Sequence, residues 1–168
     1  IASYGEQEVY ADEYLRAYFA PWQNADLSYL DLSLDKVVEF QRATAKKSYY
    51  TTEGKLFSRE QMNRIAANSV FDMEALPRPG VVLADEDVRV LPTSTPLFIS
   101  EASAKGARGL LKMDAMQNST VKPGEPLAVY GATKDGAWLF IATGSVVGWV
   151  RTGKVAPVDA EFMDSYLY

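Results

Sequence analysis

Hydrophobic positions change their spacing about halfway along the chain, and this change is the main indication of its fold. From residue 6 to about residue 68, apolar side chains recur every three or four positions, as on one face of an α-helix. From residue 81 onward, short runs of β-branched and aromatic residues are separated by turn residues, as in β-strands. The sequence therefore predicts a helical first half and a stranded second half.

The first predicted helix covers residues 6–20 and carries a stripe of aromatic residues that includes Tyr10, Tyr14 and Tyr18. We expect Pro21 to end it, because proline lacks the amide hydrogen that continues a helix, and Trp22 to lie behind that end. The stripe has the spacing of a face that packs against a second element; carbohydrate stacking is the alternative.

Two further helices are predicted from their capping residues. Ser33 is a typical N-cap for a helix that runs from residue 34 to about 47. Ser58 and Gln61 form a capping-box pattern for a third helix, which should fray near Asn68.

Residues 76–80 hold two prolines and a glycine, a combination that opposes both helix continuation and central strand pairing. We place a domain boundary there, which gives a helical segment 1–79, a stranded unit 80–160 and a tail or linker 161–168. Strands are predicted at 81–84, 88–90, 97–99, 127–130 and 154–158, and a hairpin at 134–150 turns at Gly144. In that hairpin Trp138 and Trp149 are expected to be core anchors, with the floor of a shallow ligand groove as the alternative for one of them.

Composition removes several classes of function. At 168 residues and 48% hydrophobic content the chain is long and apolar enough to fold, and no apolar run approaches the roughly 20 residues of a membrane span. A net charge of -5 argues against a nucleic-acid partner. The sequence contains neither Cys nor His, which excludes thiolate and histidine-based catalysis and the usual zinc sites. We expect no cofactor and no metal, and we interpret the acidic run at 85–87 as a solvated turn.

Residues 98–127 show little strand pattern and are long for a loop within a compact domain. Loops of this kind often carry function, so the sequence predicts a ligand-binding loop here.

The short strands, the long loop, and the hairpin that opens with Asp-Gly-x-Trp at 135–138 and closes with Gly-Trp-Val at 148–150 resemble an SH3-like barrel of the bacterial type found in cell-wall enzymes. Residues 87–98 read DVRVLPTSTPLF and resemble the R-x-x-P-T-x-x-P-x-F opening of the first SH3 domain in multidomain NlpC-type peptidases. Residues 116–119 and 123–126 are similar to that family's L-Q-N-S and Gly-x-Pro segments, and residues 18–22 to its aromatic-Pro-Trp segment. Residues 135–138 and 148–150 agree with the hairpin, whereas 129–132 read VYGA where relatives often carry a more polar His/Ser pair.

This resemblance implies an α+β fold in which an N-terminal helical segment packs on a C-terminal SH3-like β-barrel. Members of the family cleave peptidoglycan stem peptides between D-Glu and the diamino acid, with a Cys–His pair in a C-terminal catalytic domain. Because this chain has neither residue, we expect it to be non-catalytic. We expect it to bind stem peptides and gate their access to the catalytic domain, in the cell envelope, periplasmic or secreted.

The expected ligand contacts come mostly from the long loop. Amide, hydroxyl and carboxylate groups suit the amine and carboxylates of a stem peptide, and aromatic rings suit its small side chains. The candidates are Thr93, Asp114, Gln117, Asn118, Ser119, Tyr130 and Trp138. For residues 117–119, a turn that bonds its own backbone is an open alternative, and for Thr93 the alternative is a rigid strand edge.

Two other functions remain open at this point. A protein–protein interaction module without wall binding would need an aromatic groove for a proline-rich helix. An independent glycan-cleaving enzyme would need paired carboxylates, such as Glu39 with Glu53 or Asp114 with Asp135.

Overall fold

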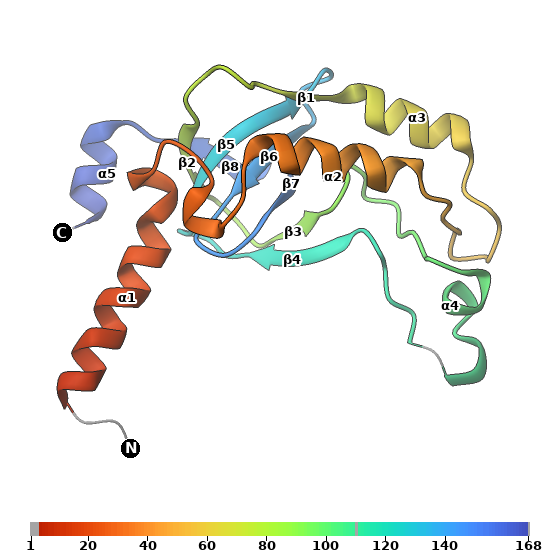
Figure 1. Cartoon of the computed structure of the whole chain (residues 1–168), viewed down its shortest axis with the longest axis horizontal. Helices are drawn as coiled ribbons and strands as arrows, with labels where there is room; N and C mark the ends of the chain where they lie inside the picture. Colours follow the sequence, from red (N-terminus) through yellow and green to blue (C-terminus); the bar gives the residue numbers. More distant parts are fainter. Residues whose placement is uncertain (1–3, 110, 168) are drawn as a thin grey trace.

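The computed structural model describes residues 4–109 and 111–167, so the outer ends of the predicted segments 1–79 and 161–168 lie outside the described residues. It confirms the α+β fold: helices come mainly from the first half, and an antiparallel sheet comes mainly from the second (Figure 1). The helices are α1 (Tyr4–Gln23), α2 (Leu34–Lys46), α3 (Arg59–Asn68), α4 (Glu101–Lys105) and α5 (Ala160–Tyr166), with short 3-10 turns η1 (Ser28–Leu30), η2 (Ala107–Gly109) and η3 (Thr152–Lys154).

The described strands form one antiparallel sheet that curls into the barrel. They are β1 (Ser69–Phe71), β2 (Arg78–Val82), β3 (Glu86–Arg89), β4 (Gln117–Val121), β5 (Pro126–Thr133), β6 (Trp138–Ala142), β7 (Val147–Arg151) and β8 (Val155–Pro157). Their order is β4-β3-β7-β6-β5-β2-β8, and β1 pairs with β5. The predicted hairpin is confirmed as β6 and β7, in which Phe140 is opposite Trp149.

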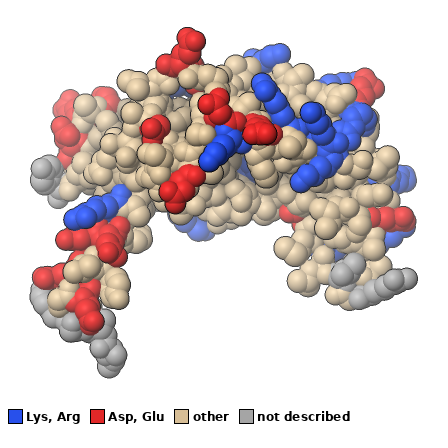
Figure 2. Space-filling model, viewed as in Figure 1, with Lys and Arg blue, Asp and Glu red and all other residues tan. Residues whose placement is uncertain are grey.

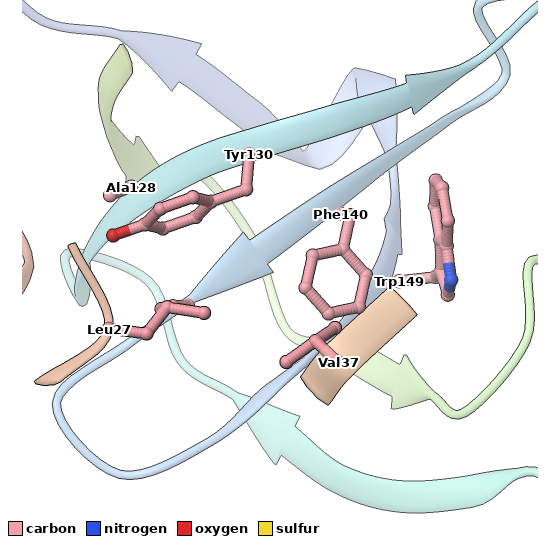
Figure 3. Packing of buried hydrophobic residues seen from close by; sticks show 7 residues of the cluster. Leu27, Val37, Ala128, Tyr130, Phe140 and Trp149 are labelled. Atoms are coloured by element: carbon pink, nitrogen blue, oxygen red, sulfur yellow. The ribbon is translucent and has the colours of Figure 1, made fainter. Parts of the chain in front are cut away.

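Strands β5, β6 and β7 are apolar on both faces, and this explains their unbroken hydrophobic sequence. One face fills the barrel interior with Val129, Ile141 and Val150, while the other lies under the helices with Phe140 and Trp149. Figure 3 shows Val37 of α2 pointing toward the second face. Trp149 is the largest completely buried side chain, so its prediction as a core anchor is confirmed. The apolar VYGA segment has the same cause, since it belongs to β5.

The capping residues predicted for α2 and α3 are confirmed. The Ser33 hydroxyl accepts a hydrogen bond from the Lys36 amide, and the Ser58 hydroxyl accepts one from the Gln61 amide. At the other end of α2, the Arg59 guanidinium donates to the carbonyl oxygens of residues 45, 46 and 47. These bonds satisfy carbonyls that a helix C-terminus otherwise leaves to water, and they tie α3 to α2.

The prediction that Pro21 ends the first helix is wrong, because α1 continues to Gln23. Proline removes the hydrogen bond to the carbonyl four residues earlier, that of Ala17. In the structure Gly144 of the β6–β7 turn lies against this carbonyl, so close that a Cβ on Gly144 would be 2.2 Å from the oxygen. Trp22 holds the helix end in place by donating from its indole nitrogen to the Gly80 carbonyl oxygen at 2.9 Å.

The aromatic stripe of α1 packs only at its C-terminal end. Phe19 is buried, whereas Tyr10 and Tyr14 are 62% and 64% exposed, so the expectation that the whole stripe covers a second element is wrong. The reason is geometric, because the N-terminal part of α1 extends away from the barrel (Figure 1).

Residues 76–80 were expected to oppose strand pairing, but they do not. Strand β2 begins at Arg78 and lies between β5 and β8. Pro79 is tolerated because it stands at the start of the strand, before the pairing with β8 begins at Gly80. Strand β1, from the predicted helical segment, also joins the sheet, and the predicted tail forms α5, whose Phe162 and Tyr166 pack edge-on against Trp22.

The predicted long loop has more structure than its sequence suggested. It contains α4, η2 and β4, whereas the strand predicted at 97–99 is reduced to a single bridge between Tyr50 and Phe98. Strand β4 was missed because four of its five residues are polar, as suits a strand at the edge of the sheet.

Candidate functional site

Arg89, the first residue of the segment RVLPTSTPLF at 89–98, is the centre of a buried polar cluster. Its guanidinium is almost completely enclosed, with a side chain 6% exposed. It donates to two backbone oxygens and two side chains: Thr93 O at 2.9 Å, Thr95 O at 3.1 Å, Asp114 Oδ2 at 2.6 Å and Gln117 Oε1 at 3.0 Å. We call this set the Arg89 clamp. It connects the end of β3 to residues 93–95, just before the long loop, and to residues 114 and 117 within that loop.

The side-chain polar groups of Asp114 and Gln117 are hydrogen-bonded to other groups of the protein, although Gln117 itself is exposed. Asp114 Oδ1 accepts from the amides of Leu97 and Met116, and Oδ2 faces Arg89. The side-chain nitrogen of Gln117, Nε2, donates to Asp87 Oδ1 and to the Ser119 carbonyl oxygen. The Thr93 hydroxyl accepts from the Thr95 amide. The structure therefore brings Thr93, Asp114 and Gln117 together around Arg89, where their contacts shape the loop.

Asn118 is a predicted site residue that borders a cavity. Its side-chain nitrogen donates to the Val147 carbonyl oxygen at 2.8 Å, which attaches β4 to β7. Among the described residues nothing donates to its Oδ1, which leaves an acceptor at the protein surface. Ser119, the next residue, is half-buried in β4 opposite Val88.

The cavity beside Asn118 lies between α2 and the barrel, and we call it the α2–barrel groove. It has a volume of about 270 Å³. Its residues come from the loop before α2, from α2 itself and from the sheet: Leu32, Lys36, Val37, Phe40, Gln41, Val90, Asn118, Phe140, Val147 and Gly148. Phe40 is 55% exposed at its edge, and Lys36 supplies a positive charge. The groove thus combines apolar walls with one ammonium and one amide oxygen, as small-ligand sites usually do.

Gln41 fixes the position of α2 above the groove floor. Its Oε1 accepts from the Trp149 indole nitrogen at 2.9 Å, and its Nε2 donates to the Val90 carbonyl oxygen at 2.8 Å. Gly148 is required at the floor, because a Cβ there would be 2.5 Å from Val88 Cγ1 and 2.8 Å from the Arg89 carbonyl oxygen. Packing therefore explains why Gly148 and Trp149 follow one another in the β6–β7 hairpin.

Tyr130 and Trp138 lie away from this groove. Tyr130 is buried under the helices, and burial raises the pKa of its phenol to about 12. Its hydroxyl makes no hydrogen bond with the described residues. Trp138 is half-buried and packs against the same apolar cluster. The seven candidates therefore do not converge on a single site.

Most of the carboxylates considered for catalysis or cation binding have structural partners, whereas Glu39 forms no ion pair with the described residues. Glu86 accepts a two-pronged bond from Arg151, and Asp85 pairs with Lys122. Hydrogen bonds, chiefly from the Thr133 hydroxyl, lower the pKa of Asp135 below its ordinary value and fix the β5–β6 turn. Within residues 4–109 and 111–167, no group of three or more acidic side chains could hold a metal ion. None of the helices described there is long and apolar enough to cross a membrane.

Residues 111–151 match the family model of an SH3 domain of the SH3b1 type. This stretch runs from the second half of the long loop through β7, and so it includes Asp114, Gln117 and Asn118. Together with the fold, the match defines an N-terminal helical region followed by a bacterial SH3-type barrel.

A solved structure extends this comparison to nearly the whole chain. The protein is similar to an NlpC/P60 endopeptidase from Photobacterium damselae subsp. piscicida, with a TM-score of 0.80 and 22% sequence identity. The similarity covers 98% of this chain and 39% of that one, so the chain spans less than half of its neighbour's length. It is a likeness of fold. No curated protein matches the chain.

Proposed function

We propose that this chain is a non-catalytic accessory region of a cell-wall endopeptidase, and that its α2–barrel groove binds the peptide part of peptidoglycan. The observation that carries the proposal is the position of Asn118, which was expected from the sequence to bind a stem peptide and which borders an apolar groove with Lys36 beside it. The similarity of fold to an NlpC/P60 endopeptidase supports the proposal.

The chemistry of the groove suits a stem peptide. Such peptides combine small side chains with carboxylates, for which Lys36 offers an ammonium. Their amide N–H groups need acceptors, and Asn118 Oδ1 is one at the groove's edge. Phe40 offers an exposed ring face against which small aliphatic side chains can pack.

The chain has no Cys and no His, so the cleavage itself would belong to a catalytic domain elsewhere in the parent protein. In this proposal the groove holds the peptide and restricts which peptides reach that domain. The compartment implied is the cell envelope.

Sedimentation with purified peptidoglycan tests the proposal. Phe40→Ala and Asn118→Ala should each weaken binding, Phe40→Ala by roughly tenfold, since about 1.4 kcal/mol is expected from covering about half of a Phe ring. Leu56→Ala is the matched control, because Leu56 is a similarly exposed apolar residue, 64% against 55%, outside the groove.

All three variants should keep the parent's circular dichroism spectrum. Unchanged binding by both groove variants, or an equal loss with Leu56→Ala, would remove the groove from the proposal.

A further inference from the structure

The opposite flank of α2 borders a second and larger cavity, between α2 and the segment that contains β1. We call it the α2–β1 cleft, and its volume is about 620 Å³. Its inner wall is apolar, with Val38, Phe71 and Leu91, and the exposed side chains of Val70 and Met73 stand at its edge. The cleft is separated from the α2–barrel groove by α2, whose Gln41 reaches both.

Four charged residues of α2 line this cleft, and the two signs are separated along the helix. Asp35 and Glu39 are in its first half, and Arg42 and Lys46 are in its second half. All four are exposed, and none of them forms an ion pair with another residue among 4–109 and 111–167. In Figure 2 basic side chains gather over the region of α2 and α3, with acidic side chains beside them.

Glu39 and Arg42 are three residues apart on α2, a spacing at which opposite charges can pair, but they form no ion pair within residues 4–109 and 111–167. Asp35 and Glu39 are four residues apart, as are Arg42 and Lys46, so each pair places like charges next to each other on the surface. The helix dipole favours an acid at the N-terminus and a base at the C-terminus, but its effect is confined to the first and last turns. It therefore accounts for Asp35 and Lys46, whereas Glu39 and Arg42 lie beyond those turns and have no ion-pair partner among the described residues.

We propose that the α2–β1 cleft binds a short peptide with free ends, its ammonium at Asp35 and Glu39 and its carboxylate at Arg42 and Lys46. The two charge pairs are seven residues apart along α2, which at 1.5 Å per residue is about 10 Å. An extended chain spans about 3.3–3.6 Å per residue, so a tripeptide matches this separation. Its small side chains would lie on the apolar wall.

This site is independent of the wall-binding proposal, because it uses the other flank of α2. Titration calorimetry with L-Ala-L-Ala-L-Ala tests it directly. We expect saturable binding at low ionic strength that weakens several-fold when salt is raised from 20 to 300 mM, since the contacts are exposed charges. N-acetylated and C-amidated trialanine should each bind at least fivefold more weakly than the free peptide.

Two substitutions identify the cleft as the site. Glu39→Gln should weaken binding of free trialanine and leave binding of the N-acetylated form unchanged, and Arg42→Gln should do the same for the C-amidated form. Lys47→Gln is the matched control, because Lys47 is an exposed base next to Lys46 and outside the cleft. Phe40→Ala in the α2–barrel groove should also have no effect.

Absence of binding at 20 mM trialanine would overturn the proposal. Equal affinity for free and blocked peptides, or an unchanged affinity in both Glu39→Gln and Arg42→Gln, would overturn it as well.

Discussion

Replacing Asp114 by Asn tests whether the Arg89 clamp organises the long loop. The substitution keeps the size of the side chain and leaves one oxygen to accept from the amides of Leu97 and Met116. It removes the negative charge opposite Arg89, whose Nη1 is 2.6 Å from Asp114 Oδ2. An amide placed there would leave the buried guanidinium without its counter-ion.

The expected cost follows from the burial of the pair. Removing one partner of a buried ion pair typically costs about 3–5 kcal/mol, because the other charge is left uncompensated. The Asp114 side chain is 20% exposed, and Arg89 keeps its other acceptors. We therefore expect the lower end of that range, about 3 kcal/mol, which for a chain of this size lowers Tm by about 6–12 °C.

Urea unfolding followed by tryptophan fluorescence measures this change. Glu60→Gln is the control, because it removes the same kind of partner from an ion pair with Arg64 in which both side chains are over 70% exposed. That substitution should cost less than about 0.5 kcal/mol. A loss below about 1 kcal/mol for Asp114→Asn would refute the structural role assigned to the clamp.

Three further substitutions test the packing of the barrel and α2. Gly148→Ala should destabilise the fold by about 1–3 kcal/mol in urea unfolding, because its Cβ would be 2.5 Å from Val88 Cγ1. Gln41→Leu should lower the free energy of unfolding by about 2–3 kcal/mol, since it leaves the buried Trp149 indole nitrogen without an acceptor. Tyr130→Phe should be neutral or slightly stabilising, as the buried hydroxyl has no hydrogen-bond partner among the described residues. The raised pKa of Tyr130, about 12, means that the unfolded chain loses this proton first, so stability should fall between pH 10 and 12, and less steeply in Tyr130→Phe.

The parts of the fold that the sequence predicted well are those decided by local chemistry. The caps at Ser33 and Ser58 depend on a hydroxyl and an amide three residues apart, and the β6–β7 hairpin depends on adjacent strands and a short turn. Each of these signals involves residues that are only a few positions apart in the sequence. The boundaries of α2 and α3 were therefore close to those observed.

The errors came from contacts between distant segments. Helix α1 continues through Pro21, where Gly144 of the β6–β7 turn lies against the carbonyl of Ala17, which the proline leaves free. Strand β4 is polar because it forms the edge of the sheet, and no hydrophobic alternation marked it.

The predictions for the site residues also failed where contacts between distant segments decide the structure. Polar residues at 114 and 117 were expected to bind a ligand, but an arginine 25 residues upstream of Asp114 binds both. Arg89 was visible in the motif, yet its burial depends on the folded loop. Asn118, in contrast, lines the α2–barrel groove, because neighbouring residues of a strand point to opposite sides.

Binding of peptidoglycan at the α2–barrel groove can be mapped by an amide chemical-shift titration of the ¹⁵N-labelled protein with a soluble disaccharide-tetrapeptide from peptidoglycan. We expect the largest shifts at the α2–barrel groove, at Lys36, Phe40, Asn118 and Gly148. Saturating shifts confined to other surfaces, or no shifts at millimolar ligand, would contradict this expectation.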